Sequence, residues 1–123
     1  MRQVDHFIAG GAGGSASRKH SIWNPSTGEV QAEVALGDAA VLQSAVDAAK
    51  KVQPEWAATN PQKRARVMFE FKRLVEAEKQ ALAELLASEH GKVVEDAHGD
   101  IQRGLEVIEY ACGIPQALKG EYT

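Results

Sequence analysis

The sequence has one cysteine, no long apolar run and no excess of positive charge, and each absence excludes a class of protein. Cys112 alone cannot form an internal disulfide, so we expect a reducing compartment, the cytoplasm or an organelle matrix. No apolar run approaches a membrane span, and the first residues lack the apolar core of a secretory signal. The formal net charge of -3 disfavours nucleic acid and anionic membranes as partners, because both favour a basic surface.

What is present is the composition of an ordinary globular chain. The 123 residues, 44% hydrophobic and 25% charged, suit one domain. Strand and turn residues occupy the first third, and helical patterns fill the remainder. We therefore predict a mainly helical α+β fold, with a β-hairpin or meander over residues 1–37 and a helical part over residues 38–119.

Three short segments carry the strand signal. Residues 7–8 and 22–23 are β-forming pieces, and residues 30–36 alternate apolar and polar side chains as a half-buried strand does. Residues 24–28, Asn-Pro-Ser-Thr-Gly, are dense in turn formers. These features predict a small antiparallel meander.

The first two helices carry recognisable start and stop signals. Apolar residues recur at helical spacing after Asp38, which predicts a helix with Asp38 as its N-cap that ends at Pro54. Asn60 and Pro61 follow as the N-cap and first-turn proline of a second helix.

A third helix is expected to end at Gly91, and a fourth to span residues 94–111. The fourth carries a continuous apolar stripe of Val94, Ala97, Ile101, Leu105, Ile108 and Cys112. Its Gly99 and Gly104 each cost about 1 kcal/mol relative to alanine in a helix interior. They indicate that another element packs closely there, or that a side chain needs room.

Arg103 lies between these glycines and outside the apolar stripe. Its planar guanidinium suits two-point recognition of a carboxylate. The alternative is an exposed arginine paired with Asp100 or Glu106 at three-residue spacing, and the residues alone favour this ion pair.

Other candidate sites are better explained structurally. Cys112 closes an apolar stripe and has no cationic partner at helical spacing, so we expect a buried side chain and no catalytic thiol. The glycine cluster at residues 10–16 matches the offsets of a dinucleotide fingerprint, but no helical pattern follows it, so a flexible hairpin loop is favoured. His90 and His98 lack the spacing of paired metal ligands on a helix, and no metal site is expected.

Several runs carry a family resemblance that covers the whole chain. The Asn-Pro-Ser-Thr-Gly-Glu turn at residues 24–29 is similar to that of the aldehyde dehydrogenase superfamily. The runs at residues 64–69, 88–92, 103–106 and 111–115 resemble the CoA-acylating methylmalonate-semialdehyde dehydrogenase branch. The chain thus resembles the amino-terminal portion of such an enzyme, part of its Rossmann-like α/β NAD domain.

The resemblance implies an activity for the complete enzyme and none for this chain alone. It implies NAD-dependent oxidation of malonate or methylmalonate semialdehyde to an acyl-CoA through a thioester, in a homotetramer. The nucleophile, the general base and the nicotinamide-binding strands would lie beyond Thr123, so we expect no catalytic residue here and neither NAD nor CoA bound by this chain alone. The arginine of the Arg-Gly-Leu-Glu run, Arg103, would hold the carboxylate of the substrate.

The helices pose a packing problem that leaves a second interpretation open. Each has an apolar stripe to bury, and a small meander offers little surface for this. We therefore expect exposed apolar surface, so that the chain self-associates, swaps elements with a copy of itself, pairs with the rest of the enzyme or is only marginally folded. The alternative function is accordingly a catalytically inactive, truncated helical module.

Overall fold

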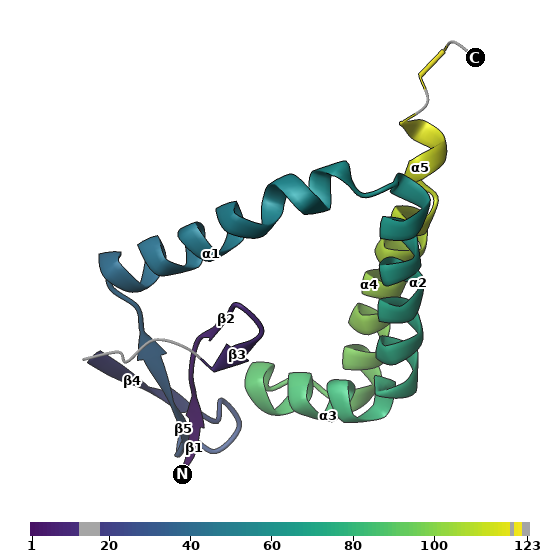
Figure 1. Cartoon of the computed structure of the whole chain (residues 1–123). Coiled ribbons are helices and arrows are strands. Elements are labelled where there is room, and N and C mark those ends of the chain that lie inside the picture. The colour runs from purple at the N-terminus through teal and green to yellow at the C-terminus, as the bar shows by residue number, and fades with distance from the viewer. Residues whose placement is uncertain (13–17, 119, 122–123) are drawn as a thin grey trace. The chain divides into compact units, whose positions relative to one another are not determined.

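The computed structural model describes residues 1–12, 18–118 and 120–121. The chain divides into two compact units, Met1–Ala58 and Thr59–Thr123. The first unit holds the described strands and helix α1, and the second holds helices α2 to α5 (Figure 1). The predicted arrangement, a short strand region followed by a larger helical part, is confirmed.

The first unit contains a three-stranded sheet in the order β1-β5-β4, built from Arg2–Val4, Val30–Leu36 and Arg18–Trp23. Strands β4 and β5 pair antiparallel, as the meander predicts. Strand β1 was not predicted, and it pairs parallel to β5, with Gln3 opposite Glu33. The sheet is therefore mixed, and the prediction of a purely antiparallel meander is wrong. The central strand β5 has two edges to satisfy, and the amino-terminal residues fill the edge that β4 leaves open.

A two-stranded hairpin, β2 (Phe7–Ile8) and β3 (Gly11–Ala12), forms a separate sheet. Its turn residues Ala9 and Gly10 have φ of 55° and 84°, and positive φ at both positions is the geometry of a tight type I′ hairpin. The first part of the glycine cluster therefore forms the predicted hairpin. Residues 13–16 of that cluster lie outside the described residues.

The turn predicted between β4 and β5 is confirmed. The Ser26 amide donates to Asn24 Oδ1 at 2.9 Å, and the Gly28 amide donates to the Asn24 carbonyl at 2.8 Å. Gly28 has φ of 74°, a left-handed conformation that glycine adopts without strain. This turn reverses the chain and sets the antiparallel register.

Helix α1 (Ala39–Ala58) begins as predicted and ends later than predicted. Asp38 Oδ1 accepts a hydrogen bond from the Val41 amide at 2.9 Å, which caps the first turn. Pro54 lies inside the helix, so its predicted role as the stop is wrong. A proline removes one helical hydrogen bond without forbidding the turns that follow, and here the helix continues for another turn.

The actual end of α1 is set by Pro61. A proline disfavours the helical conformation of the residue before it, and Asn60 is extended, with φ of -50° and ψ of 131°. Asn60 Oδ1 then accepts from the Gln62 amide at 2.8 Å and caps α2 (Pro61–Ala77), as predicted. The same pair of residues thus ends one helix and starts the next.

The remaining helices are α3 (Lys79–His90), α4 (Val94–Cys112) and the short α5 (Ile114–Ala117). Gly91 ends α3 in the left-handed conformation, with φ of 83°, as predicted. Helix α4 matches the predicted fourth helix to within a residue, whereas α5 was not predicted.

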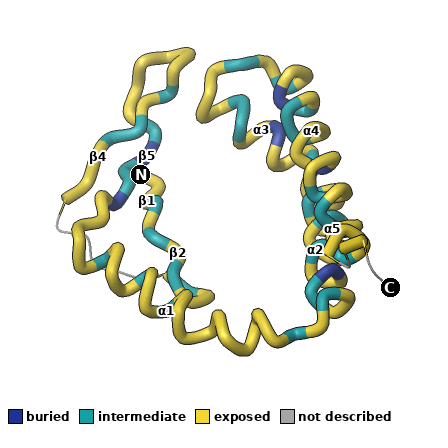
Figure 2. Tube along the Cα trace, turned by 90° about the horizontal axis from the view of Figure 1, so that it is seen from above, coloured by how far each residue is buried: buried dark blue, intermediate teal, exposed yellow. Residues whose placement is uncertain are grey.

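Helix α4 packs against both α2 and α3. The residues buried at these contacts are Ala65, Ala83, Ala97, Leu105 and Cys112, and Figure 2 shows buried positions where α3 and α4 face each other. Small side chains let the helices approach closely, but they bury little apolar area. The second unit is consequently held by a thin interface, and many of its larger apolar side chains stay at the surface.

Candidate functional site

Arg103 projects from α4 with 78% of its side chain exposed. Its Nη1 donates to Asp100 Oδ1 at 2.9 Å, across one helical turn. The ion pair expected from the residues alone is therefore present. A guanidinium carries five N–H donors, so this bond leaves most of its donor capacity for another acceptor.

Asp100 also binds a second cation. Lys92, in the connection between α3 and α4, donates from Nζ to Asp100 Oδ2, so that the two carboxylate oxygens are each held by a different positive group. The Lys92 side chain is 20% exposed and the Asp100 side chain 37%. We refer to these three residues as the Lys92–Asp100–Arg103 cluster.

The cluster keeps Asp100 ionised. The hydrogen bond from Lys92 lowers the pKa of the Asp100 carboxyl most strongly, and the charges of Lys92, Arg103 and His90 lower it further. Because the folded-state pKa is lowered, the stability that the cluster contributes is present at neutral pH and is lost as the pH falls through the lowered pKa. At neutral pH two cations and one anion leave the cluster with a net positive charge, which suits an anionic ligand.

The flanks of Arg103 on α4 are open. Apart from the adjacent residues and the backbone of α4 itself, a Cβ added to Gly99 or to Gly104 would meet no atom of the described residues within 4 Å. No other element described in the second unit therefore accounts for these two glycines. The open space at these two glycines could take a ligand or another segment.

An apolar groove lies on the second unit, and Gly104 is part of its wall. It has a volume of about 460 Å³ and runs between α2, α3 and α4. Its other lining residues are Phe71, Val75, Leu82, Leu85, Leu86, Glu89, Ile101 and Ile108. Arg103 therefore stands next in sequence to an open apolar surface of the second unit.

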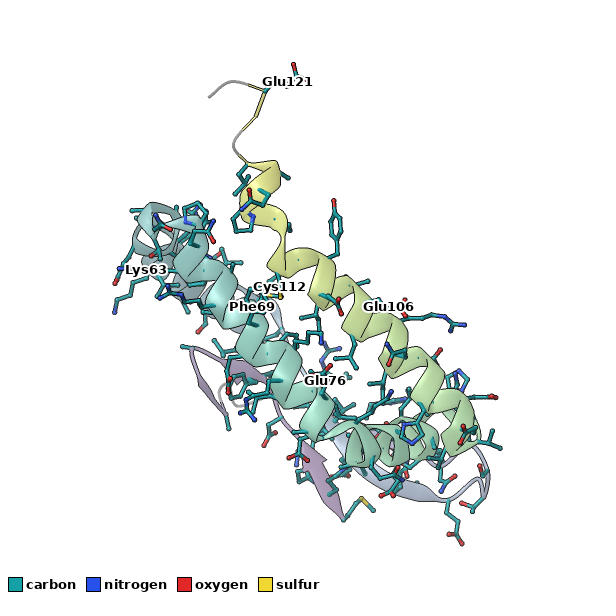
Figure 3. All side chains as sticks on the ribbon, turned by 90° about the vertical axis from the view of Figure 1, so that its right-hand side faces the viewer. Lys63, Phe69, Glu76, Glu106, Cys112 and Glu121 are labelled. Atoms are coloured by element: carbon teal, nitrogen blue, oxygen red, sulfur yellow. The ribbon has the colours of Figure 1, made fainter. Side chains whose placement is uncertain are left out.

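Cys112 is buried, as predicted, with 8% of its surface exposed. Figure 3 shows it on the side of α4 that faces α2. A thiol in this position fills space between two helices, which supports a packing role and gives no access to a substrate.

We expect Cys112 in the native 123-residue chain to react with a disulfide reagent at least about tenfold more slowly than in the unfolded chain, since an opening free energy of about 1.4 kcal/mol already has this effect. Thiol titration with and without denaturant measures the ratio, because the sequence has no other cysteine. A matched control is Val107→Cys in a Cys112→Ala background, because Val107 is 68% exposed on the same helix. Equal native rates for the two thiols would contradict the packing role.

The described residues offer little for a metal or a nucleotide. They contain no group of three or more histidine, cysteine or acidic side chains that could hold a metal ion. His98 Nε2 instead lies 3.0 Å from Gln80 Oε1. The residues after the glycine cluster, Arg18–Trp23, form strand β4, whereas a phosphate cradle requires a helix amino terminus there.

Across the described part of the chain, every helix is too short or too polar to cross a membrane.

Comparison with known proteins identifies the class. The sequence profile of the Aldehyde dehydrogenase family matches residues 13–123. The chain therefore belongs to the aldehyde dehydrogenase family.

Individual relatives show which members of the family the chain is similar to. The malonate-semialdehyde dehydrogenase of Pseudomonas aeruginosa is 44% identical over 123 residues, which is all of this chain and 25% of the relative. A protein of Sinorhizobium meliloti described as a methylmalonate-semialdehyde dehydrogenase, solved in complex with NAD, is 52% identical with a TM-score of 0.95, over 100% of this chain and 25% of that one. The methylmalonate-semialdehyde dehydrogenase of Oceanimonas doudoroffii has a TM-score of 0.95 at 42% identity, over 98% of this chain and 25% of that one.

These comparisons confirm the resemblance inferred from the sequence, to both the superfamily and the semialdehyde branch. They also fix the extent of the match, because the chain spans about a quarter of the length of the relatives it matches.

Proposed function

We propose that this chain is the amino-terminal part of an NAD-dependent, CoA-acylating malonate- or methylmalonate-semialdehyde dehydrogenase. In this proposal residues 1–123 form part of the cofactor-binding domain, and the complete enzyme is a homotetramer. The names of the relatives support the substrate class. The observation that carries the proposal is Arg103, an exposed guanidinium in a net positive cluster, on a helix whose Gly99 and Gly104 leave open space where a side chain would stand.

The proposed reaction oxidises the aldehyde to an acyl-CoA, for which NAD would supply the hydride acceptor and CoA the acyl acceptor in the complete enzyme. The residues of this chain act at the other end of the substrate. Arg103 donates two N–H groups to the substrate carboxylate and so fixes the position of the aldehyde carbon, which a single carbon separates from the carboxylate. The nucleophile and the residues that hold NAD and CoA belong to the part of the enzyme outside these 123 residues.

An arginine in this role determines specificity. A site built to bind a charged group discriminates strongly against a substrate that lacks it, because its own polar groups then stay unpaired. Aldehydes without a carboxylate leave Arg103 with Asp100 as its sole anionic partner in the cluster. The proposal therefore predicts a preference for semialdehydes over simple aldehydes of similar length.

The test uses a chimera in which these 123 residues replace the matching segment of the Pseudomonas aeruginosa relative, which is 44% identical to them. We expect the chimera to reduce NAD in the presence of CoA and malonate semialdehyde and to release an acyl-CoA detectable by mass spectrometry. The 123-residue chain alone should give no reduction, since hydride transfer requires a bound nicotinamide and a nucleophile. Activity of the isolated chain, or a chimera that prefers propanal, would contradict the proposal.

A second function, a catalytically inactive helical module that associates with itself or with the rest of the enzyme, is favoured by one observation. Large apolar side chains remain exposed on both units, among them Leu42 and Trp56 on α1 and Phe69 and Leu85 on α2 and α3. Such surface marks an interaction site in a soluble protein. In both functions this apolar surface binds another polypeptide. The functions differ in whether a substrate binds to Arg103.

A further inference from the structure

We propose that Asp100 is a positioning residue for Arg103, and that Lys92 offsets the charge of Asp100 so that the guanidinium still attracts a carboxylate. This inference rests on the proposed function of Arg103. It extends that function from one residue to three, one of which lies outside α4.

The hydrogen bond between Asp100 and Arg103 restrains the guanidinium on one side. Arg103 reaches Asp100 through Nη1 alone, at 2.9 Å, so Asp100 holds one edge of the guanidinium and leaves the other nitrogens free. An unrestrained arginine side chain has many rotamers, and part of this freedom is lost on binding a ligand. A guanidinium already held on one side loses less, and binds more tightly for that reason.

Without Lys92, Asp100 would weaken the binding of the substrate carboxylate to Arg103. A carboxylate next to Arg103 cancels its charge, competes for its donors and repels an anionic substrate. Lys92 removes this disadvantage because it occupies Oδ2, the oxygen that Arg103 does not use. Without Lys92, both oxygens of Asp100 become available to the guanidinium, which can then form the two-point pair that the substrate requires.

The chain supplies a matched control for Lys92. Lys79, at the start of α3, also reaches α4, where its Nζ donates to Gln102 Oε1 at 3.0 Å. Its partner is neutral and adjacent in sequence to Arg103. Lys79→Met therefore removes the same charge and another side-chain hydrogen bond to α4, without changing the partners of Asp100.

The experiment measures KM for malonate semialdehyde and for propanal in the chimera. The result is expressed as the ratio of KM for malonate semialdehyde to KM for propanal. We expect Asp100→Asn and Lys92→Met each to raise the ratio by about three- to fivefold, the range of partly exposed ion pairs. Lys79→Met should leave the ratio unchanged. Because Lys92 acts through Asp100, adding Lys92→Met to Asp100→Asn should have no further effect on it.

Each outcome decides one question. If Arg103→Leu changes the ratio but Asp100→Asn and Lys92→Met do not, the positioning role is wrong and the proposed function stands. If Arg103→Leu leaves the ratio unchanged, the proposed function itself fails. A merely structural cluster would shift KM for both substrates together, and additive effects of Asp100→Asn and Lys92→Met would show that Lys92 acts independently of Asp100.

Discussion

Replacing Arg103 by leucine in the chimera should raise KM for malonate semialdehyde about ten- to hundredfold, the loss expected for charge-assisted hydrogen bonds to a carboxylate. KM for propanal should change little, because propanal has no group for Arg103 to bind. Leucine is chosen because it keeps α4 helical and fills part of the arginine volume. Steady-state kinetics on the two substrates measure the effect.

A lysine at the same position separates charge from geometry. Arg103→Lys keeps the positive charge but loses the planar two-point donor, so we expect KM for malonate semialdehyde to fall between those of the native and leucine forms. Full recovery with lysine would show that only the charge matters. Equal increases of KM for both aldehydes in Arg103→Leu would remove Arg103 from carboxylate recognition.

The second large effect concerns the 123-residue chain in isolation. Its accessible surface is 9162 Å². Two independent compact globules, each with half of the chain mass, would expose about 7,700 Å² together. The difference exceeds the roughly 800 Å² that each partner buries in a stable protein interface.

We accordingly expect the isolated chain to bind a hydrophobic dye and to form dimers or larger species at micromolar concentration. Size-exclusion chromatography with light scattering over a hundredfold dilution series measures the association. The chimera, in which the rest of the enzyme is present, should bind much less dye per copy of this segment. A monomer that stays dye-free at all dilutions would contradict the account of the exposed apolar faces.

The helices could be predicted because their limits are set by local chemistry. Asp38, Asn60 and Gly91 act within one turn of their own positions, and each cap is found where the sequence places it. Pro54 was misjudged because a proline late in a helix costs one hydrogen bond, and the strength of the surrounding helix decides whether it continues.

The sheet was less predictable because strand pairing is not local. Strand β1 has three residues and no apolar alternation, and only its partner β5 makes it a strand. Burial in β5 also departs from the predicted alternation. Ala32 and Ala35 are both buried although they lie on opposite faces, because a small side chain in a central strand is covered by its neighbours on either face.

The site was predicted in part. Arg103 and its pairing with Asp100 follow from helical spacing, which places residues three apart on one face. The contact of Lys92 with Asp100 does not, because eight residues and a helix start separate them.

The most direct measurement of the central claim, that Arg103 binds the carboxylate of the substrate, is a crystal structure of the chimera with malonate as an unreactive mimic. We expect two guanidinium nitrogens of Arg103 within about 3 Å of one malonate carboxylate, with Asp100 still bound to Nη1. Malonate held by other residues, with Arg103 bound to Asp100 alone, would contradict the claim.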